Sequence, residues 1–149
     1  MFSIICVVSY WLCKDYFYLD DDYLLYELII PKIQFKMNLY DLNSDLNNID
    51  GNIEILDDSN IENNLFFIAG HSGNGDKCFF NRIRELVIGD YVYIVNDNVV
   101  LIYKVVNSYF IVKDGYMESN GYSRNFLYLV TCDIYNNNRQ LIVEGILVN

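Results

Sequence analysis

Phe126-Leu127-Tyr128-Leu129-Val130-Thr131-Cys132 predicts a β-strand that ends in a thiol, because β-branched and aromatic residues favour strands. Successive side chains of a strand point to opposite faces, so Val130 and Cys132 should share one face. Leu129 and Thr131 should lie on the other face. The thiol of Cys132 is therefore expected to project from the end of a strand.

Short segments of the same kind follow one another along the chain from residue 23 onward. Strands are expected over residues 23–30, 33–40, 65–69, 91–95, 99–106, 109–112, 126–131 and 141–148. Asn96-Asp97-Asn98 predicts a hairpin turn, and the Asn/Asp-rich residues 41–64 predict a loop. Many short strands with turn signals indicate an all-β fold, either a small barrel or a sandwich.

One helical segment is expected among these strands. Phe79, Phe80, Ile83 and Leu86 are spaced at helical intervals, which predicts a short helix. Arg82 and Arg84 lie in the same segment and are expected to be solvated.

Composition limits the class of protein further. The 149 residues are 53% hydrophobic and 20% charged, which favours one folded domain over a disordered chain. The net charge of −10 argues against nucleic acid as a partner. The sequence holds one histidine and four cysteines, so a metal site with two or more histidines is excluded and no metal is expected.

The negative charge lies mostly in the first part of the chain. Residues 1–62 carry twelve acidic and three basic side chains, whereas residues 63–149 are nearly balanced. The Asp20-Asp21-Asp22 run lacks the spacing of an EF-hand calcium loop. A solvated acidic face is therefore favoured over a calcium site or a surface for a cationic partner.

The N-terminal residues 1–22 form a separate apolar segment ahead of the domain expected over 23–149. The apolar run 2–13 is shorter than the roughly 20 residues of a membrane-spanning helix, and no basic residue precedes it. Three interpretations stay open: a truncated membrane anchor, a short signal-like segment, or a buried strand or helix. The truncated anchor is slightly favoured.

Three reactive side chains lie at predicted strand ends. His71 follows the strand over 65–69 in a glycine-rich loop, and Arg139 lies seven residues after Cys132. A thiol with an unperturbed pKa of about 8.5 is only about 3% ionised at pH 7, so a nucleophilic cysteine needs a nearby cation. His71 and Arg139 are the candidates, and the planar guanidinium of arginine also suits binding of an oxyanion.

The order of these motifs resembles the sortases, the cysteine transpeptidases of Gram-positive cell surfaces. Phe67-Ile68-Ala69-Gly70-His71 is similar to their histidine motif, and Tyr128-Leu129-Val130-Thr131-Cys132 to their Thr-Leu-x-Thr-Cys motif. Arg139 before Leu141-Ile142-Val143 resembles their arginine before the closing strand. Together with Ile30-Pro31-Lys32-Ile33 and the segment from Phe79 to Tyr93, the resemblance covers roughly residues 24–148.

The resemblance implies an eight-stranded sortase-type β-barrel with one or two short helices. It implies that Cys132 attacks the Thr–Gly carbonyl of a C-terminal Leu-Pro-x-Thr-Gly sorting signal and that His71 moves the proton. Arg139 would hold the substrate and its oxyanion, and Val130 and Thr131 would contact the substrate. The partners would be surface proteins with sorting signals and an amine acceptor on a cell-wall precursor or a pilin, at the outer face of the plasma membrane. No cofactor is expected, and calcium dependence is left open.

The chain also departs from the common family pattern. Tyr128 stands where the first threonine of the cysteine motif is expected, and the segment between Tyr109 and Phe126 is short, unlike the class B enzymes. The only proline is Pro31, so the Asp-Pro-aromatic lid motif of the class C enzymes is missing. A compact class D-like or unassigned member is the expectation.

Two alternatives to catalysis by Cys132 remain. The chain could be a degenerate, non-catalytic sortase-like barrel that serves as a binding or structural module. Alternatively, Cys78 could pair with His71, because it precedes the predicted helix and a helix N-terminus favours the thiolate.

Overall fold

A computed structural model describes residues 24–113 and 124–149 of the chain. The eight strands are β1 (Leu24–Ile30), β2 (Phe35–Tyr40), β3 (Glu54–Ile55), β4 (Phe66–Ala69), β5 (Tyr91–Val95), β6 (Val100–Val112), β7 (Phe126–Cys132) and β8 (Arg139–Leu147). Three single-turn 3-10 helices cover Pro31–Ile33, Ile61–Asn63 and Ile83–Glu85. The predicted N-terminal anchor lies outside the described residues, and none of the helices within them is long and apolar enough to cross a membrane.

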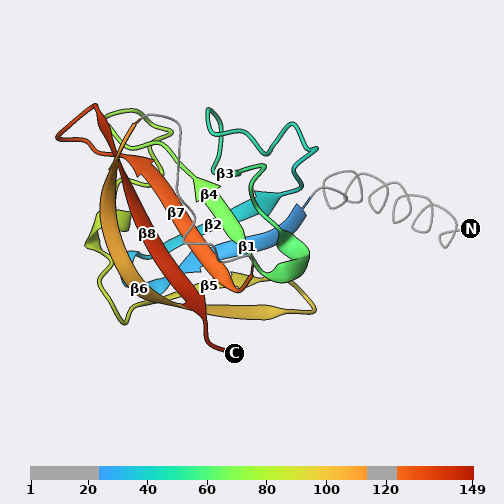
Figure 1. Ribbon diagram of the computed structural model, residues 1–149. Helices are drawn as coiled ribbons and strands as arrows, with labels where there is room; N and C mark the ends of the chain where they lie inside the picture. Colours follow the sequence, from blue (N-terminus) through green and yellow to red (C-terminus); the bar gives the residue numbers. More distant parts are fainter. Residues whose placement is uncertain (1–23, 114–123) are drawn as a thin grey trace, which may run out of the picture.

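The eight strands form one sheet that curls into a nearly closed barrel (Figure 1). Their order is β2-β1-β5-β6-β8-β7-β4-β3, and contacts between β2 and β3 bring the two edges of the sheet together. All neighbouring strands are antiparallel except β4 and β7, which are parallel. The prediction of an all-β, eight-stranded barrel is confirmed.

The inner face of the barrel holds the main hydrophobic core. Every strand contributes to it, and Tyr103, Phe66 and Phe80 are among its largest fully buried side chains. Burial of such side chains out of water is the main favourable contribution to folding. The alternation expected for β7 is confirmed, because Leu129 packs in this core and Val130 packs on the outer face.

Two expected elements differ from the structure. The helix expected from Phe79 to Leu86 is instead a series of turns that ends in the 3-10 helix Ile83–Glu85. The apolar spacing has another cause, because these turns bury Phe80, Ile83 and Leu86 against the core. The strands expected over 99–106 and 109–112 are one continuous strand, β6, whose register shifts at a bulge between Val105 and Asn107.

A second, smaller apolar cluster covers the outer face of β4, β7 and β8. It consists of Leu65, Phe67, Ala69, Phe126, Tyr128, Val130 and Ile142. Tyr128 is fully buried there and stacks on Phe67 with ring centroids 4.7 Å apart. The unusual tyrosine of the cysteine motif therefore packs in the barrel wall.

Glu144 is a buried carboxyl group in this outer layer. It lies opposite Tyr128 in the β7–β8 ladder, and its Oε2 atom is buried without a hydrogen-bond partner among the described residues. Burial raises the pKa of Glu144 above its ordinary value. Burial also raises the pKa of Tyr109, with a smaller contribution from the charge of Glu144.

We expect Glu144→Gln to stabilise the protein at neutral pH by about 1 kcal/mol, because the amide cannot ionise. Because burial raises the pKa of Glu144 in the folded state, ionisation of Glu144 lowers stability as pH rises through that pKa. At low pH the carboxyl is protonated in both the folded and the unfolded state, and the penalty is absent. The gain should thus be present at pH 8 and vanish near pH 4. Urea unfolding of both proteins at the two pH values measures it, and an equal gain at both would contradict the assignment.

Candidate active site

The ends of four strands meet at one end of the barrel and carry the candidate site. The C-terminal ends of β4, β6 and β7 lie there together with the start of β8, because β4 runs parallel to β7 and β8 runs antiparallel to β6 and β7. In Figure 1 this end lies at the upper left, where the turn joins β7 to β8.

The parallel pairing of β4 with β7 brings the His71 loop to Cys132. Ala69 is the register partner of Val130, and Gly70 N–H continues the ladder by donating to the Val130 carbonyl at 3.1 Å. Continuing the register by two residues places the backbone of His71 beside that of Cys132. Neighbouring strands are about 4.8 Å apart, so the two backbones are close enough for their side chains to meet.

The side chain of Thr131 holds the His71 loop against the end of β7. Its buried hydroxyl donates to the Gly70 carbonyl at 2.7 Å and accepts from the Ser72 hydroxyl at 2.5 Å. Residues on both sides of His71 are thus attached to the residue before Cys132. Thr131 has a positioning role that the sequence resemblance did not indicate, and its contact with substrate, like that of the buried Val130, stays a prediction.

The side chain of His71 is half-exposed and directed to the loop between β2 and β3. Its Nε2 atom lies 3.1 Å from Oδ1 of Asp50, and the carboxyl group of Asp50 is exposed. No hydrogen bond joins His71 to Cys132 in the part of the chain that the structure describes. Catalytic hydrogen bonds often tighten only when substrate binds, and proton transfer by His71 stays a prediction.

Cys132 is half-buried and open to a cavity. The cavity has a volume of about 470 Å³ and is lined by Ser72, Gly73, Asn74, Asn81, Cys132, Asp133, Ile134 and Asn137. Lys113 donates to the Sγ atom of Cys132, with its Nζ atom 3.4 Å away. Sequence spacing gave no sign of this lysine, which precedes Cys132 by 19 residues.

No hydrogen bond joins Arg139 to Cys132 within the described part of the chain. The Nε atom of Arg139 donates to Oδ2 of Asp133 at 2.5 Å, and its guanidinium carbon lies 3.9 Å from the centre of the Phe110 ring. Arg84 also pairs with Asp133, at 3.3 Å, so the expectation that Arg84 is solvated was wrong. The hydrogen bond from Arg139 lowers the pKa of the buried Asp133 carboxyl.

The helix that favoured Cys78 as an alternative nucleophile is not present in the structure at residues 79–86. Cys78 is half-buried in the loop between β4 and β5, and turns follow it where a helix was expected. The nearest helix is the three-residue 3-10 turn that begins at Ile83. A helix N-terminus is therefore not available to favour the Cys78 thiolate.

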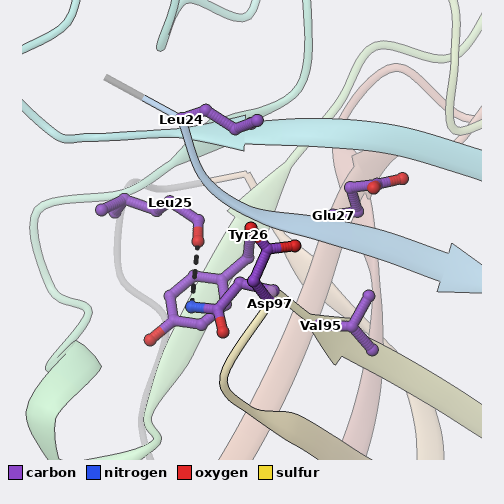
Figure 2. A pocket seen from close by; sticks show the side chains of 7 residues that line it. Leu24, Leu25, Tyr26, Glu27, Val95 and Asp97 are labelled. Atoms are coloured by element: carbon purple, nitrogen blue, oxygen red, sulfur yellow. Dashed lines mark hydrogen bonds between the residues drawn. The ribbon is translucent and has the colours of Figure 1, made fainter. Parts of the chain in front are cut away.

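No group of three or more His, Cys, Asp or Glu side chains able to hold a metal ion occurs among residues 24–113 and 124–149. Figure 2 shows another cavity of about 280 Å³, where Asn96 donates to the carbonyl of Leu25. It lies by the β5–β6 turn, at the opposite end of β6 from Lys113.

The described residues form an eight-stranded barrel with Cys132 at the end of β7. The family model described as "Sortase domain" matches residues 28–148, and the chain belongs to the sortase family. Sortases are cysteine transpeptidases of the Gram-positive cell envelope. No curated protein matches the sequence.

Solved structures show the same fold. Sortase C1 from Streptococcus agalactiae is 24% identical with a TM-score of 0.72, over 85% of this chain and 68% of that one. Sortase C1 from Streptococcus suis is 21% identical with a TM-score of 0.73, over 88% and 76%. Sortase C from Streptococcus pneumoniae, a structure described for its catalysis and pilin substrate specificity, is 19% identical with a TM-score of 0.71, over 85% and 69%. At these identities the likeness shows the fold and leaves the subgroup open.

Proposed function

We propose that this sortase cleaves a C-terminal sorting signal of the Leu-Pro-x-Thr-Gly type between Thr and Gly and transfers the acyl part to an amine. The acceptor is a cell-wall precursor or a pilin lysine, at the outer face of the plasma membrane. The observation that carries the proposal is the pairing of β4 with β7, which sets the His71 backbone beside Cys132.

The chemistry divides one amide exchange into two steps. The Sγ atom of Cys132 attacks the threonine carbonyl carbon, the bond to the glycine nitrogen breaks, and His71 gives that nitrogen a proton. The incoming amine then attacks the thioester carbonyl and gives a proton to His71, and the carbon–sulfur bond breaks to release Cys132 as a thiolate. Holding of the substrate by Arg139, as the family resemblance implies, stays a prediction.

A trapped intermediate tests the proposal directly. We expect incubation with Leu-Pro-x-Thr-Gly-type peptides, varied at each position, to give a thioacyl adduct on the Cys132 peptide in mass spectrometry. Adding an amine should convert the adduct into a transfer product. An adduct on Cys78, or none with any peptide in a folded protein, would contradict the proposal.

A non-catalytic barrel is the second candidate. It is favoured by the contact of His71 with Asp50 and by the departure of Tyr128 from the family motif. A folded chain that binds sorting peptides without forming an adduct would support it.

A further inference from the structure

The register of β6, β7 and β8 determines which basic side chain lies on the same face of the sheet as Cys132. Cys132 on β7 is the register partner of Gln140 on β8, so these two side chains share one face of the sheet. Arg139 precedes Gln140 and therefore points to the other face. Its position over the Phe110 ring agrees, because Phe110 is the partner of Leu141, a residue of the inner core.

Lys113 lies on the same face as Cys132. Val112 is the register partner of Arg139 at the end of β6, and Lys113 N–H continues the ladder by donating to the Asn138 carbonyl at 2.8 Å. Alternation then turns Lys113 away from the face of Arg139 and toward that of Cys132. β8 separates the two strands, a distance of about 10 Å that a lysine and a cysteine side chain can bridge.

Arg139 is held in place by partners of its own. It pairs with Asp133, whose side chain is completely buried, and moving it would leave that carboxylate with Arg84 as its one charged partner among the described residues. Removing one partner of a buried charge is costly, because the remaining charge is left incompletely compensated. Lys113 is exposed, and within the described residues the Cys132 sulfur is the one hydrogen-bond partner of its ammonium group.

We propose that Lys113 supplies the positive charge that stabilises the thiolate of Cys132, in the place that the sequence suggested for Arg139. The inference rests on the proposed function in that Cys132 is taken as the nucleophile. An ammonium group a few ångströms from a thiolate favours the ionised form and so increases the fraction of reactive sulfur.

Alkylation of Cys132 by iodoacetamide tests the inference on the full chain. Rates are measured between pH 6 and pH 9 by mass spectrometry of the Cys132 peptide, with the Cys78 peptide as an internal reference. We expect Lys113→Met to slow alkylation at pH 7 about tenfold and to move the pH profile to higher pH. Lys113→Arg should keep the fast rate, because it retains the charge.

Two further variants serve as comparisons. Lys104→Met removes another exposed lysine of β6, which pairs with Tyr91 away from the site, and should label like the parent. Arg139→Gln should change the rate less than Lys113→Met. The inference is overturned if Lys113→Met labels at the parent rate, or if a folded Arg139→Gln variant shows the larger loss.

The two proposals fail in different ways. Alkylation requires no sorting peptide, so a charge effect of Lys113 without any thioacyl adduct would retain the inference and reject the transpeptidase. Adduct formation with equal alkylation rates in the parent and Lys113→Met would retain the transpeptidase and reject the inference.

Discussion

Replacing Cys132 with alanine is expected to abolish transfer of sorting peptides, with a loss of about 10,000-fold or more. In the proposed mechanism the sulfur forms the covalent intermediate, and no neighbouring group can replace it. Removal of a nucleophile from other covalent enzymes costs this much or more. Release of the glycine-containing fragment, followed by liquid chromatography, measures the change.

Cys78→Ala is the matched control for this variant. Cys78 is half-buried like Cys132 but lies in the loop after His71, and it is expected to keep the parent rate. Loss of activity in Cys78→Ala, with activity retained in Cys132→Ala, would identify Cys78 as the nucleophile.

Gly70→Ala is expected to lower the free energy of unfolding by about 2–3 kcal/mol, the largest change in stability predicted here. A Cβ atom at Gly70 would lie 2.6 Å from Cγ of Phe80. The Phe80 ring is fully buried in the inner core, and the backbone N–H of Phe80 donates to the His71 carbonyl at 3.0 Å. The ring cannot move aside without disturbing both the core and the His71 loop.

Urea unfolding measures this loss, and a decrease of the midpoint on the order of 1 M is expected. Gly51→Ala is the control, because a Cβ atom there meets nothing within 4 Å. An unchanged midpoint in Gly70→Ala would show that the loop and the Phe80 ring adapt freely.

Local pattern in the sequence predicted much of the barrel. The strands that carry the site were expected near their observed positions, because β-branched and aromatic residues alternate along them. The two-residue strand Glu54–Ile55 was missed, since so short a segment has no periodicity to detect. The false helix at Phe79–Leu86 arose because consecutive turns can bury apolar residues at helix-like intervals.

The side chains around the thiol were harder to predict, because strand register and a bulge decide them. The separation of seven positions between Cys132 and Arg139 suggested proximity, but the register makes Gln140 the partner of Cys132. Counting alternate residues along β6 would put Lys113 on the face of Tyr103, inside the barrel. The bulge after Val105 reverses that alternation, and no sequence signal marked it.

The parallel pair β4–β7 also determines when the site comes into existence during folding. The hydrogen bond from Thr131 to Gly70 joins residues 61 positions apart, whereas β7 and β8 are connected by a short turn. The loss of chain entropy on closing that long loop precedes the favourable contacts of the β4–β7 pairing. Cys132 and its neighbours on β8 can therefore assemble locally, but His71 joins them only once the chain has closed around the core. If His71 is the proton donor of the proposed mechanism, a partly unfolded molecule in which β4 has not paired with β7 would carry the Cys132 thiol without that donor.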